Sequence, residues 1–314
     1  MFEQVLQTIQ CYDTIITHRH SKPDGDAMGS QIGLKHILEE NFPKKQIYMV
    51  GDDPRFFSFM EDSVMDEIPD SVYEGALAFI LDCGSSSLIS DNRYSLAQKT
   101  IRLDHHIFCE TIADIEVIDS SYESCCGLVA DLARESGLKL NVLAAQSLYT
   151  GMLTDSGRFR YDSTTAKTFE LAAFLMRANF DTNEIFRHLY ADEYANKKLK
   201  AQFTLKIQFT ENNVAFIYTD LEDFATYGVD SFTISRGMVG TMADMKGVDV
   251  WVNFTETEQG VLCELRSSKY NINPIAVKYG GGGHAKASGA TVPDRDTAMS
   301  MLRDLDAMIQ GEEQ

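Results

Sequence analysis

The sequence predicts an α/β protein with two domains, the first a mostly parallel sheet flanked by helices and the second a smaller α/β domain. Three observations support this. The chain has 314 residues, more than one hydrophobic core usually supports. Short apolar runs alternate with helical patterns in its first part, which is typical of βαβ units. A second series of apolar runs follows a polar helical stretch at residues 190–206.

The first domain is expected at residues 1–190. Its predicted strands and helices alternate, with strands at 14–17, 46–50, 77–82 and 100–104 and helices at 27–40 and 125–135. This alternation predicts a sheet with helices on both faces. Ligands bind such sheets at the carboxyl ends of the strands, so functional side chains are expected there.

The second domain is expected at residues 209–314. The segment 191–208 is strongly helical but shows no clear apolar stripe, so it is predicted to be a linker helix between the domains. The predicted elements of the second domain are strands at 214–218, 248–254 and 260–265 and helices at 235–245 and 294–309.

Composition excludes several classes of protein. The formal net charge of −19 argues against a protein that follows long duplex nucleic acid, because that function needs a broad basic surface. No apolar run is long enough to cross a membrane and the first residues lack a signal-peptide pattern, so we expect a cytoplasmic protein without a membrane partner. Six cysteines without CxxC spacing indicate reduced thiols.

Side chains that bind metals follow four of the apolar runs. They are His20, Asp24 and Asp26 in His-Ser-Lys-Pro-Asp-Gly-Asp, then Asp82, then Asp104-His105-His106, and finally Asp155 in Thr-Asp-Ser-Gly. Each residue alone would be read as a helix cap or a solvated loop residue. Together, at strand and helix ends of one domain, they predict a metal site.

The spacing of these residues predicts two divalent cations. His20 and Asp24 can reach one cation and Asp26 the second, while Asp82 is the natural bridge and His105 and Asp155 complete the second site. Mixed imidazole and carboxylate ligands without thiolate favour Mn²⁺ or a similar first-row cation over structural zinc.

A glycine-rich segment near the C-terminus predicts an anion site. Gly280, Gly281, Gly282 and Gly283 are followed by His284 and Lys286. Successive glycines let backbone N–H groups converge on a phosphate and let a nucleotide approach closely. Arg266 can form a bidentate pair with a phosphate, and residues 261–290 carry four cations against one acid.

With these motifs the chain resembles the DHH/DHHA1 phosphoesterases, and over nearly its whole length their short nano-RNase/pAp-phosphatase type. The resemblance implies two Mn²⁺, a bridging Asp82 and a His106 that contacts phosphate rather than metal. It also implies that Arg266-Ser267 and Gly280 to His284 bind a nucleotide, and that substrate enters a cleft between the domains. Glu264, Leu265 and Ser156 depart from common family residues, which concerns fine substrate preference.

The resemblance implies hydrolysis of very short RNA to mononucleotides, and of 3′-phosphoadenosine 5′-phosphate (pAp) to AMP. His106, Asp82 and Asp104 form the predicted catalytic set, with His106 stabilising phosphoryl charge or protonating the leaving oxygen. Arg158 is a further candidate for phosphate contact. The alternatives are a phosphodiesterase for linear or cyclic dinucleotides, a manganese pyrophosphatase, and a catalytically idle nucleotide-binding regulator. A homodimer is compatible with the sequence.

Overall fold

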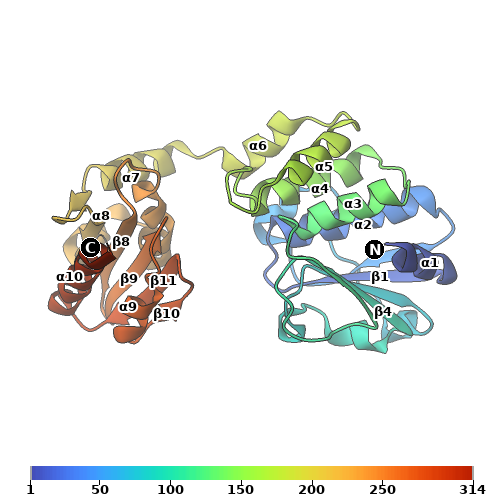
Figure 1. Cartoon of the computed structure of the whole chain (residues 1–314), viewed down its shortest axis with the longest axis horizontal. Helices are drawn as coiled ribbons and strands as arrows, with labels where there is room; N and C mark the ends of the chain where they lie inside the picture. Colours follow the sequence, from blue (N-terminus) through green and yellow to red (C-terminus); the bar gives the residue numbers. More distant parts are fainter. Residues whose placement is uncertain (1, 313–314) are drawn as a thin grey trace. The chain divides into compact units, whose positions relative to one another are not determined.

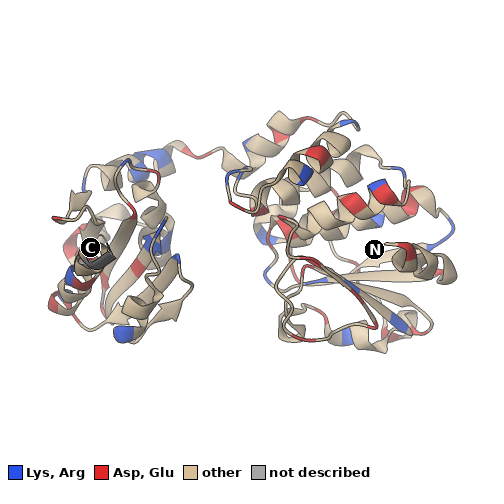
Figure 2. Ribbon diagram, viewed as in Figure 1, with Lys and Arg blue, Asp and Glu red and all other residues tan. Residues whose placement is uncertain are grey.

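The computed structural model describes residues 2–312, which form two compact units that part after Ala191 (Figure 1). Within the described residues, no helix is long and apolar enough to cross a membrane. Figure 2 shows Asp and Glu spread over both units, so the negative net charge is not confined to one of them.

The first unit is built on a five-stranded parallel sheet in the order β2-β1-β3-β4-β5. Its strands are β1 Thr14–Arg19, β2 Gln46–Met49, β3 Leu77–Leu81, β4 Lys99–Asp104 and β5 Ile115–Ile118. The four predicted strands are present. The strand β5 was not predicted, because only two of its four residues, Ile115 and Val117, are buried.

Six α-helices belong to this unit: α1 Glu3–Cys11, α2 Gly25–Asn41, α3 Cys125–Glu135, α4 Val142–Asp155, α5 Ala166–Met176 and α6 Thr182–Tyr190. Figure 1 shows α2 to α5 stacked on the same side of the sheet, and all six helices contribute to one core. That core includes alternate strand residues, such as Phe79 and Leu81 of β3.

The prediction of helices on both faces is therefore wrong. The opposite face, where Ile16 and Ile80 point, is covered by loops and by the 3₁₀ turns η2 Asp70–Tyr73 and η4 Asn92–Leu96. Two further 3₁₀ turns, η1 Arg55–Phe59 and η3 Ser86–Leu88, lie in the same connections. These connections are broken by glycine, proline and serine, which favour turns over continuous helix.

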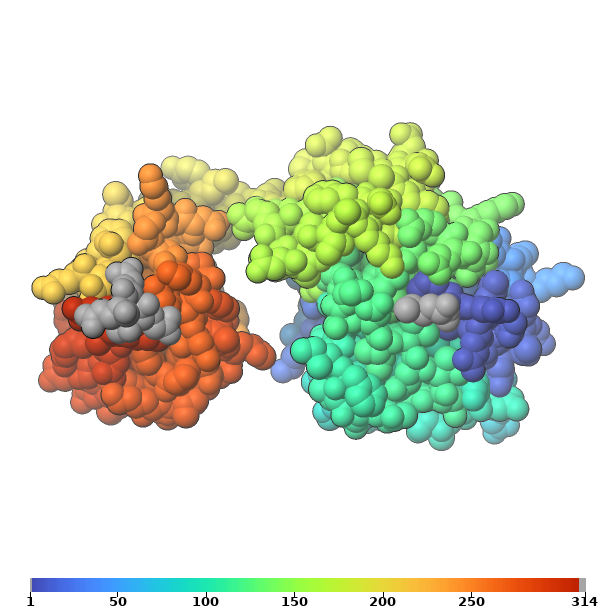
Figure 3. All heavy atoms as spheres, in the orientation of Figure 1, coloured from blue at the N-terminus to red at the C-terminus, as the bar shows by residue number. Residues whose placement is uncertain are grey.

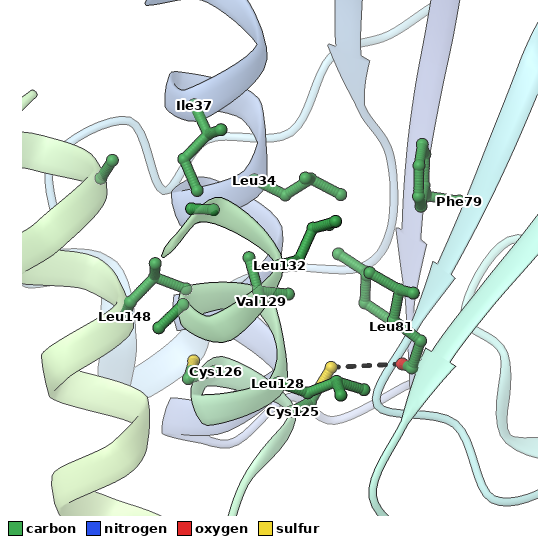
Figure 4. Packing of buried hydrophobic residues seen from close by; sticks show 14 of the residues in the cluster. Leu34, Ile37, Phe79, Leu81, Cys125, Cys126, Leu128, Val129, Leu132 and Leu148 are labelled. Atoms are coloured by element: carbon green, nitrogen blue, oxygen red, sulfur yellow. Dashed lines mark hydrogen bonds between the residues drawn. The ribbon is translucent and has the colours of Figure 1, made fainter. Parts of the chain in front are cut away.

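The helix α3 packs beside α2 on the same face of the sheet (Figure 4). Leu128, Val129 and Leu132 fill the space between Leu34 of α2 and Leu81 of β3. Buried Cys125 donates a hydrogen bond from its thiol to the carbonyl of Leu103 at 3.2 Å. All six cysteines are free thiols, as predicted, and burial raises the pKa of the Cys125 thiol well above its usual value.

The second unit contains a six-stranded mixed sheet in the order β10-β11-β9-β8-β7-β6. Its strands are β6 Gln208–Phe209, β7 Ala215–Thr219, β8 Val250–Thr257, β9 Gly260–Ser267, β10 Gly282–Gly283 and β11 Ala287–Val292. The pair β7 and β8 is parallel and the others are antiparallel. The helices are α7 Tyr194–Thr204, α8 Leu221–Tyr227, α9 Asn273–Lys278 and α10 Arg295–Glu312.

Each face of this sheet has its own core. The helices α9 and α10 cover the face of Val252 and Leu265, and α7 packs on the other face with Ile217. In the space-filling view, the atoms of this unit, yellow to red, form a closely packed body (Figure 3).

Two predictions for this region need correction. The polar stretch expected as a linker has a buried side, because Leu199 and Phe203 of α7 lie in the second unit's core. Residues 235–245 do not form a regular helix. They belong to a π-helical turn, η5 Thr233–Gly237, and a 3₁₀ turn, η6 Val239–Met242, at a point where Gly237 and Gly240 weaken helix propensity.

Candidate metal centre

The metal-binding side chains of the first unit converge because β1, β3 and β4 are adjacent and parallel. His20 follows β1, Asp82 follows β3, and Asp104 ends β4 just before His105. Asp82 has a left-handed backbone with φ of 53°, an uncommon conformation for a residue other than glycine. Such strain at the centre of a ligand cluster indicates that its carboxylate direction is functionally constrained.

Two helices complete the cluster. Asp24 caps α2, accepting hydrogen bonds of 3.0 Å from the backbone N–H groups of Asp26 and Ala27, and Asp155 ends α4. Close packing of α2 on α4 brings their carboxylates together. A Cβ at Gly29 would lie 2.5 Å from the carbonyl oxygen of Ser147, so only glycine allows this approach.

Three side chains form the first ligand group. The Nε2 atom of His20 lies 3.4 Å from Oδ2 of Asp82 and 3.7 Å from Oδ1 of Asp24. The Nδ1 atom of His20 is 2.9 Å from the carbonyl oxygen of Ser21. Donation from Nδ1 to this carbonyl leaves Nε2 as a free lone pair facing the two carboxylates, as a metal-ligating histidine requires.

The second ligand group is centred on His105. Its Nε2 atom lies 3.5 Å from Oδ1 of Asp82, 3.5 Å from Oδ2 of Asp155 and 3.7 Å from Oδ2 of Asp26. Asp82 thus offers one oxygen to each group. All six sequence-predicted metal ligands are brought together, in the groups His20-Asp24-Asp82 and Asp26-His105-Asp155.

The charges of this cluster are unbalanced without a cation. Burial and the neighbouring Asp82 and Asp155 raise the pKa of Asp26 well above its usual value, and burial raises that of Asp155 to about 6. Burial opposes protonation of His20 and His105, but hydrogen bonds to the surrounding carboxylates outweigh it and raise their pKa values to about 11 and about 10.

The centre of the cluster also has an unsatisfied acceptor. The Oδ1 atom of Asp82 is buried and has no hydrogen-bond partner within residues 2–312. A buried carboxylate oxygen without a donor is costly unless a cation binds it. The oxygen and imidazole donors present therefore fit divalent cations such as Mn²⁺ or Mg²⁺.

The carboxylate of Asp26 is held by the start of another helix. The backbone N–H groups of Cys125 and Cys126 donate to its two oxygens at 2.7 and 2.8 Å, at the N-terminus of α3. Sequence reasoning missed these partners, since backbone donors carry no residue-type signal. Ser124, which caps α3 through a bond from the N–H of Gly127, marks the helix start that could have revealed them.

His106 is oriented by buried charges. Its Nδ1 atom is 2.7 Å from Oδ1 of Asp104, whose other oxygen accepts a 2.5 Å bond from Arg102. Arg102 and Asp104 are fully buried, whereas His106 is half exposed. Asp104, predicted as a catalytic residue, is instead placed behind His106 as its hydrogen-bond partner. The hydrogen bond to Asp104 raises the pKa of His106.

Asp52 anchors the loop that carries His20 and Asp24. Its carboxylate accepts bonds from the buried Arg19 at 2.7 Å, from the backbone N–H of Lys22 at 2.8 Å and from Ser90 at 2.9 Å. Arg19 also donates to the carbonyl of His20 at 3.1 Å. Neither Asp52 nor Arg19 was predicted to matter, since a single acid in a loop gives no sequence signal.

Arg158 lies three residues beyond Asp155 in a left-handed turn, with φ of 64°. Its exposed guanidinium stacks over the ring of Tyr190 at 5.0 Å. No described contact joins it to the ligand groups, so its predicted role at the phosphate remains a proposal.

The glycine-rich segment of the second unit is an ordered hairpin rather than a flexible loop. Gly282 and Gly283 pair with Gly289 and Ser288 of β11. Gly283 has φ of 131°, and a Cβ there would lie 2.6 Å from the carbonyl oxygen of Ala287. His284 and Lys286 are exposed at the tip, as an anion site requires.

Three other polar residues of the second unit that the sequence analysis singled out already have partners within this unit. Arg266 pairs with Glu264 at 3.1 Å, and Lys278 of the expected basic patch pairs with Asp304 at 2.7 Å. The hydroxyl of Ser267 accepts bonds from the backbone N–H groups of Lys269 and Tyr270, so it shapes a turn and keeps only its O–H donor for a substrate.

Comparisons with known proteins identify the two domain families of the chain. Residues 14–152 match the model of the DHH family, N-terminal domain, and residues 213–311 match the DHHA1 domain. The chain is 35% identical to the bifunctional oligoribonuclease and PAP phosphatase NrnA of Bacillus subtilis across the full length of both. It is 36% identical to the probable NrnA of Streptococcus mutans, covering 92% of this chain and 93% of that protein.

A solved structure shares the fold. The exopolyphosphatase-related protein of Bacteroides fragilis superposes with a TM-score of 0.82 at 24% identity, covering 98% of this chain and 97% of that one. At this identity the likeness concerns the fold alone.

Proposed function

Because the chain belongs to the DHH family, we propose that it is a metal-dependent phosphoesterase that hydrolyses very short RNA to mononucleotides and pAp to AMP. The observation that carries this proposal is the position of Asp82, whose two oxygens face two separate ligand groups. The names of the full-length relatives supply the substrate class.

Six residues would hold the cations: His20, Asp24 and Asp82 on one side, and Asp26, His105 and Asp155 with Asp82 on the other. We propose Mn²⁺ as the resident metal because imidazole joins the carboxylates. Two such cations lower the pKa of water and offset the negative charge of phosphoryl oxygens.

His106 would act on the substrate itself. Its Nδ1 atom is engaged by Asp104, which leaves Nε2 for a phosphoryl or leaving oxygen, and the raised pKa favours the protonated ring. In the hydrolysis, water adds to phosphorus, the bond to the leaving oxygen breaks and that oxygen receives a proton. Protonated His106 can supply this proton or stabilise the developing charge, while Arg158 is a second candidate for the phosphate.

The hairpin of the second unit would bind the nucleoside or terminal phosphate of the substrate. His284 and Lys286 are exposed beside glycine backbone that a ligand can approach closely. Arg266 would join them by exchanging its pairing with Glu264 for a phosphate, since its Nη2 faces Glu264 and its Nη1 donates to the carbonyl of Leu265.

The test is hydrolysis by the purified full chain with Mn²⁺ of ribo-dinucleotide, ribo-pentanucleotide, pAp, linear pApA, cyclic di-AMP, pyrophosphate and a long RNA duplex. We expect turnover of the short RNAs and pAp, loss of activity in EDTA, and no measurable activity in Asp82→Asn. Asp114→Asn serves as the control, since Asp114 is a carboxylate of the same unit that binds Thr100 away from the cluster.

Other outcomes identify the rival functions. Preferred hydrolysis of cyclic di-AMP or pyrophosphate would replace the proposed substrate. Binding of pAp without turnover of any substrate would instead identify a nucleotide-binding regulator.

A further inference from the structure

A groove of about 560 Å³ lies on the sheet of the second unit, beside the glycine hairpin. Its floor is formed by β9 and β11, where Leu262 and Gly289 lie. One end reaches Gly280 and Gly281, and one wall is the segment of Phe232 and Arg236. Gly280, Gly281 and Gly289 also belong to the glycine-rich segment and its paired strand described above, whereas Leu262, Phe232 and Arg236 do not.

The wall of the groove presents an aromatic ring and a cation. Phe232 is 64% exposed and lines the groove. The guanidinium of Arg236 lies 5.9 Å from the centre of that ring. Within residues 2–312, no carboxylate forms an ion pair with Arg236, although the chain as a whole is strongly acidic.

This wall is held rigidly. Phe232 and Arg236 flank the buried residues Ile234 and Ser235 of a π-helical turn. The fully buried Asn253 of β8 donates from Nδ2 to the carbonyls of Ile234 and Ser235 at 2.7 and 2.8 Å. Single π-helical turns are rare and occur often at functional sites. The turn therefore leaves Phe232 and Arg236 outside the core, while the hydrogen bonds from Asn253 hold its backbone in place.

We propose that this groove is a subsite for an additional nucleotide of an RNA substrate, with a base stacked on Phe232 and a backbone phosphate bound by Arg236. Exposed aromatic rings beside arginine are the usual platform for unpaired bases, which stack regardless of sequence. The volume lies within the range of small-molecule sites. The proposal rests on the proposed function, because that function supplies RNA as the occupant.

The position of the groove indicates which substrates use it. A substrate with one nucleoside, such as pAp, would be held by the hairpin tip at His284. The groove meets the hairpin at its other end, at Gly280 and Gly281, so it would serve only substrates with further nucleotides. Phe232 and Arg236 are therefore expected to determine the preference for oligonucleotide length.

The test compares Phe232→Ala and Arg236→Ala with matched controls in the same unit. Phe209→Ala removes another exposed phenylalanine, on β6 at the opposite edge of the sheet. Arg295→Ala removes another arginine that stacks on an aromatic ring, that of Tyr218. Binding of fluorescein-labelled penta-adenylate and of pAp is measured with the full chain in EDTA, and kcat/KM for both is measured with Mn²⁺.

We expect the Kd for penta-adenylate to rise about fivefold to tenfold in each groove variant, because each variant loses either one stacked base or one phosphate contact. The Kd and kcat/KM for pAp should change less than twofold, and both controls should match the wild type. Equal losses for both ligands, or no loss for either, would overturn the subsite while the proposed function stands. Failure of the wild type to bind or hydrolyse either ligand would overturn the proposed function together with the subsite.

Discussion

Arg102 and Asp104 form an ion pair of 2.5 Å in which both side chains are fully buried. A buried carboxylate is stable only if donors satisfy it, and here Arg102 binds one oxygen while His106 binds the other. Burial opposes ionisation of Asp104, but these two partners outweigh it and lower its pKa. Asp104 is thus a positioning residue that fixes the ring of His106.

Asp104→Asn should lower kcat for pAp about 100-fold or more, because an amide no longer stabilises the protonated ring or fixes its tautomer. The KM and the number of bound Mn²⁺ ions, measured by mass spectrometry of metals, should stay near those of the wild type. Loss of a metal ion from this variant would show that Asp104 supports the ligand groups instead.

Asp52→Ala should destabilise the first unit by about 3 kcal/mol, because it leaves the buried Arg19 without its partner. Urea unfolding measures this loss. The double variant Arg19→Met, Asp52→Leu should recover much of it, since an apolar pair needs no ionic partner. Asp223→Asn is the control: it breaks the partly exposed pair with Lys206 and should cost less than about 1 kcal/mol. A loss in Asp52→Ala no larger than the control's would contradict the anchoring role.

Gly29→Ala should weaken both stability and Mn²⁺ affinity. Alanine gains roughly 1 kcal/mol in helix propensity, but its Cβ would lie 2.5 Å from a backbone carbonyl that cannot move freely. Overpacking of this kind costs about 1–3 kcal/mol and would separate α2 from α4, and with them Asp26 from Asp155. Gly240→Ala, with nothing within 4 Å of the added Cβ, is the control. Calorimetric titration with Mn²⁺ would show unchanged affinity if the glycine contact were irrelevant to the site.

The ionised Asp131 should make the stability of the first unit depend on pH. Its buried carboxylate accepts bonds from Tyr122 and Lys167 at 2.7 Å each, and these outweigh burial and lower its pKa. A lowered folded-state pKa gives stability that is present above the ordinary value of 3.8 and lost as pH falls through the folded value.

The urea midpoint of Asp131→Asn should therefore lie below that of the wild type at pH 7 and at pH 5. Below pH 4 the wild type should lose stability faster, and the difference should shrink. A difference that stays constant down to pH 3 would assign the effect to packing rather than to charge.

His284→Ala should raise KM for pAp about tenfold and leave hydrolysis of bis-p-nitrophenyl phosphate unchanged, because a remote binding group acts only on substrates that reach it. His188→Ala, which removes an exposed histidine stacked on Phe59 in the first unit, is the control. Equal losses on both substrates would mean that the hairpin supports the fold. Gly283→Val is unsuitable for this test, since the side chain would also break the hairpin at Ala287.

Local sequence patterns were enough to predict the parallel sheet of the first unit and the identity of the candidate ligands. Apolar runs that end in His20, Asp82 or Asp104 are local patterns, and parallel strands place their carboxyl ends at one edge. The prediction of helices on both faces of this sheet was wrong, because turn-forming residues in the connections leave only loops and 3₁₀ turns on one face.

How the ligands are held depends on contacts between distant segments, which the sequence patterns did not reveal. Asp26 receives its donors from residues 99 and 100 positions away, and Asp155 joins the cluster through the glycine contact of α2 with α4. The wall of Phe232 and Arg236 likewise depends on Asn253, which lies on the strand β8. Such contacts join segments far apart in the chain through backbone groups. Every residue type carries these groups, and packing decides which of them form hydrogen bonds, so residue type does not reveal them.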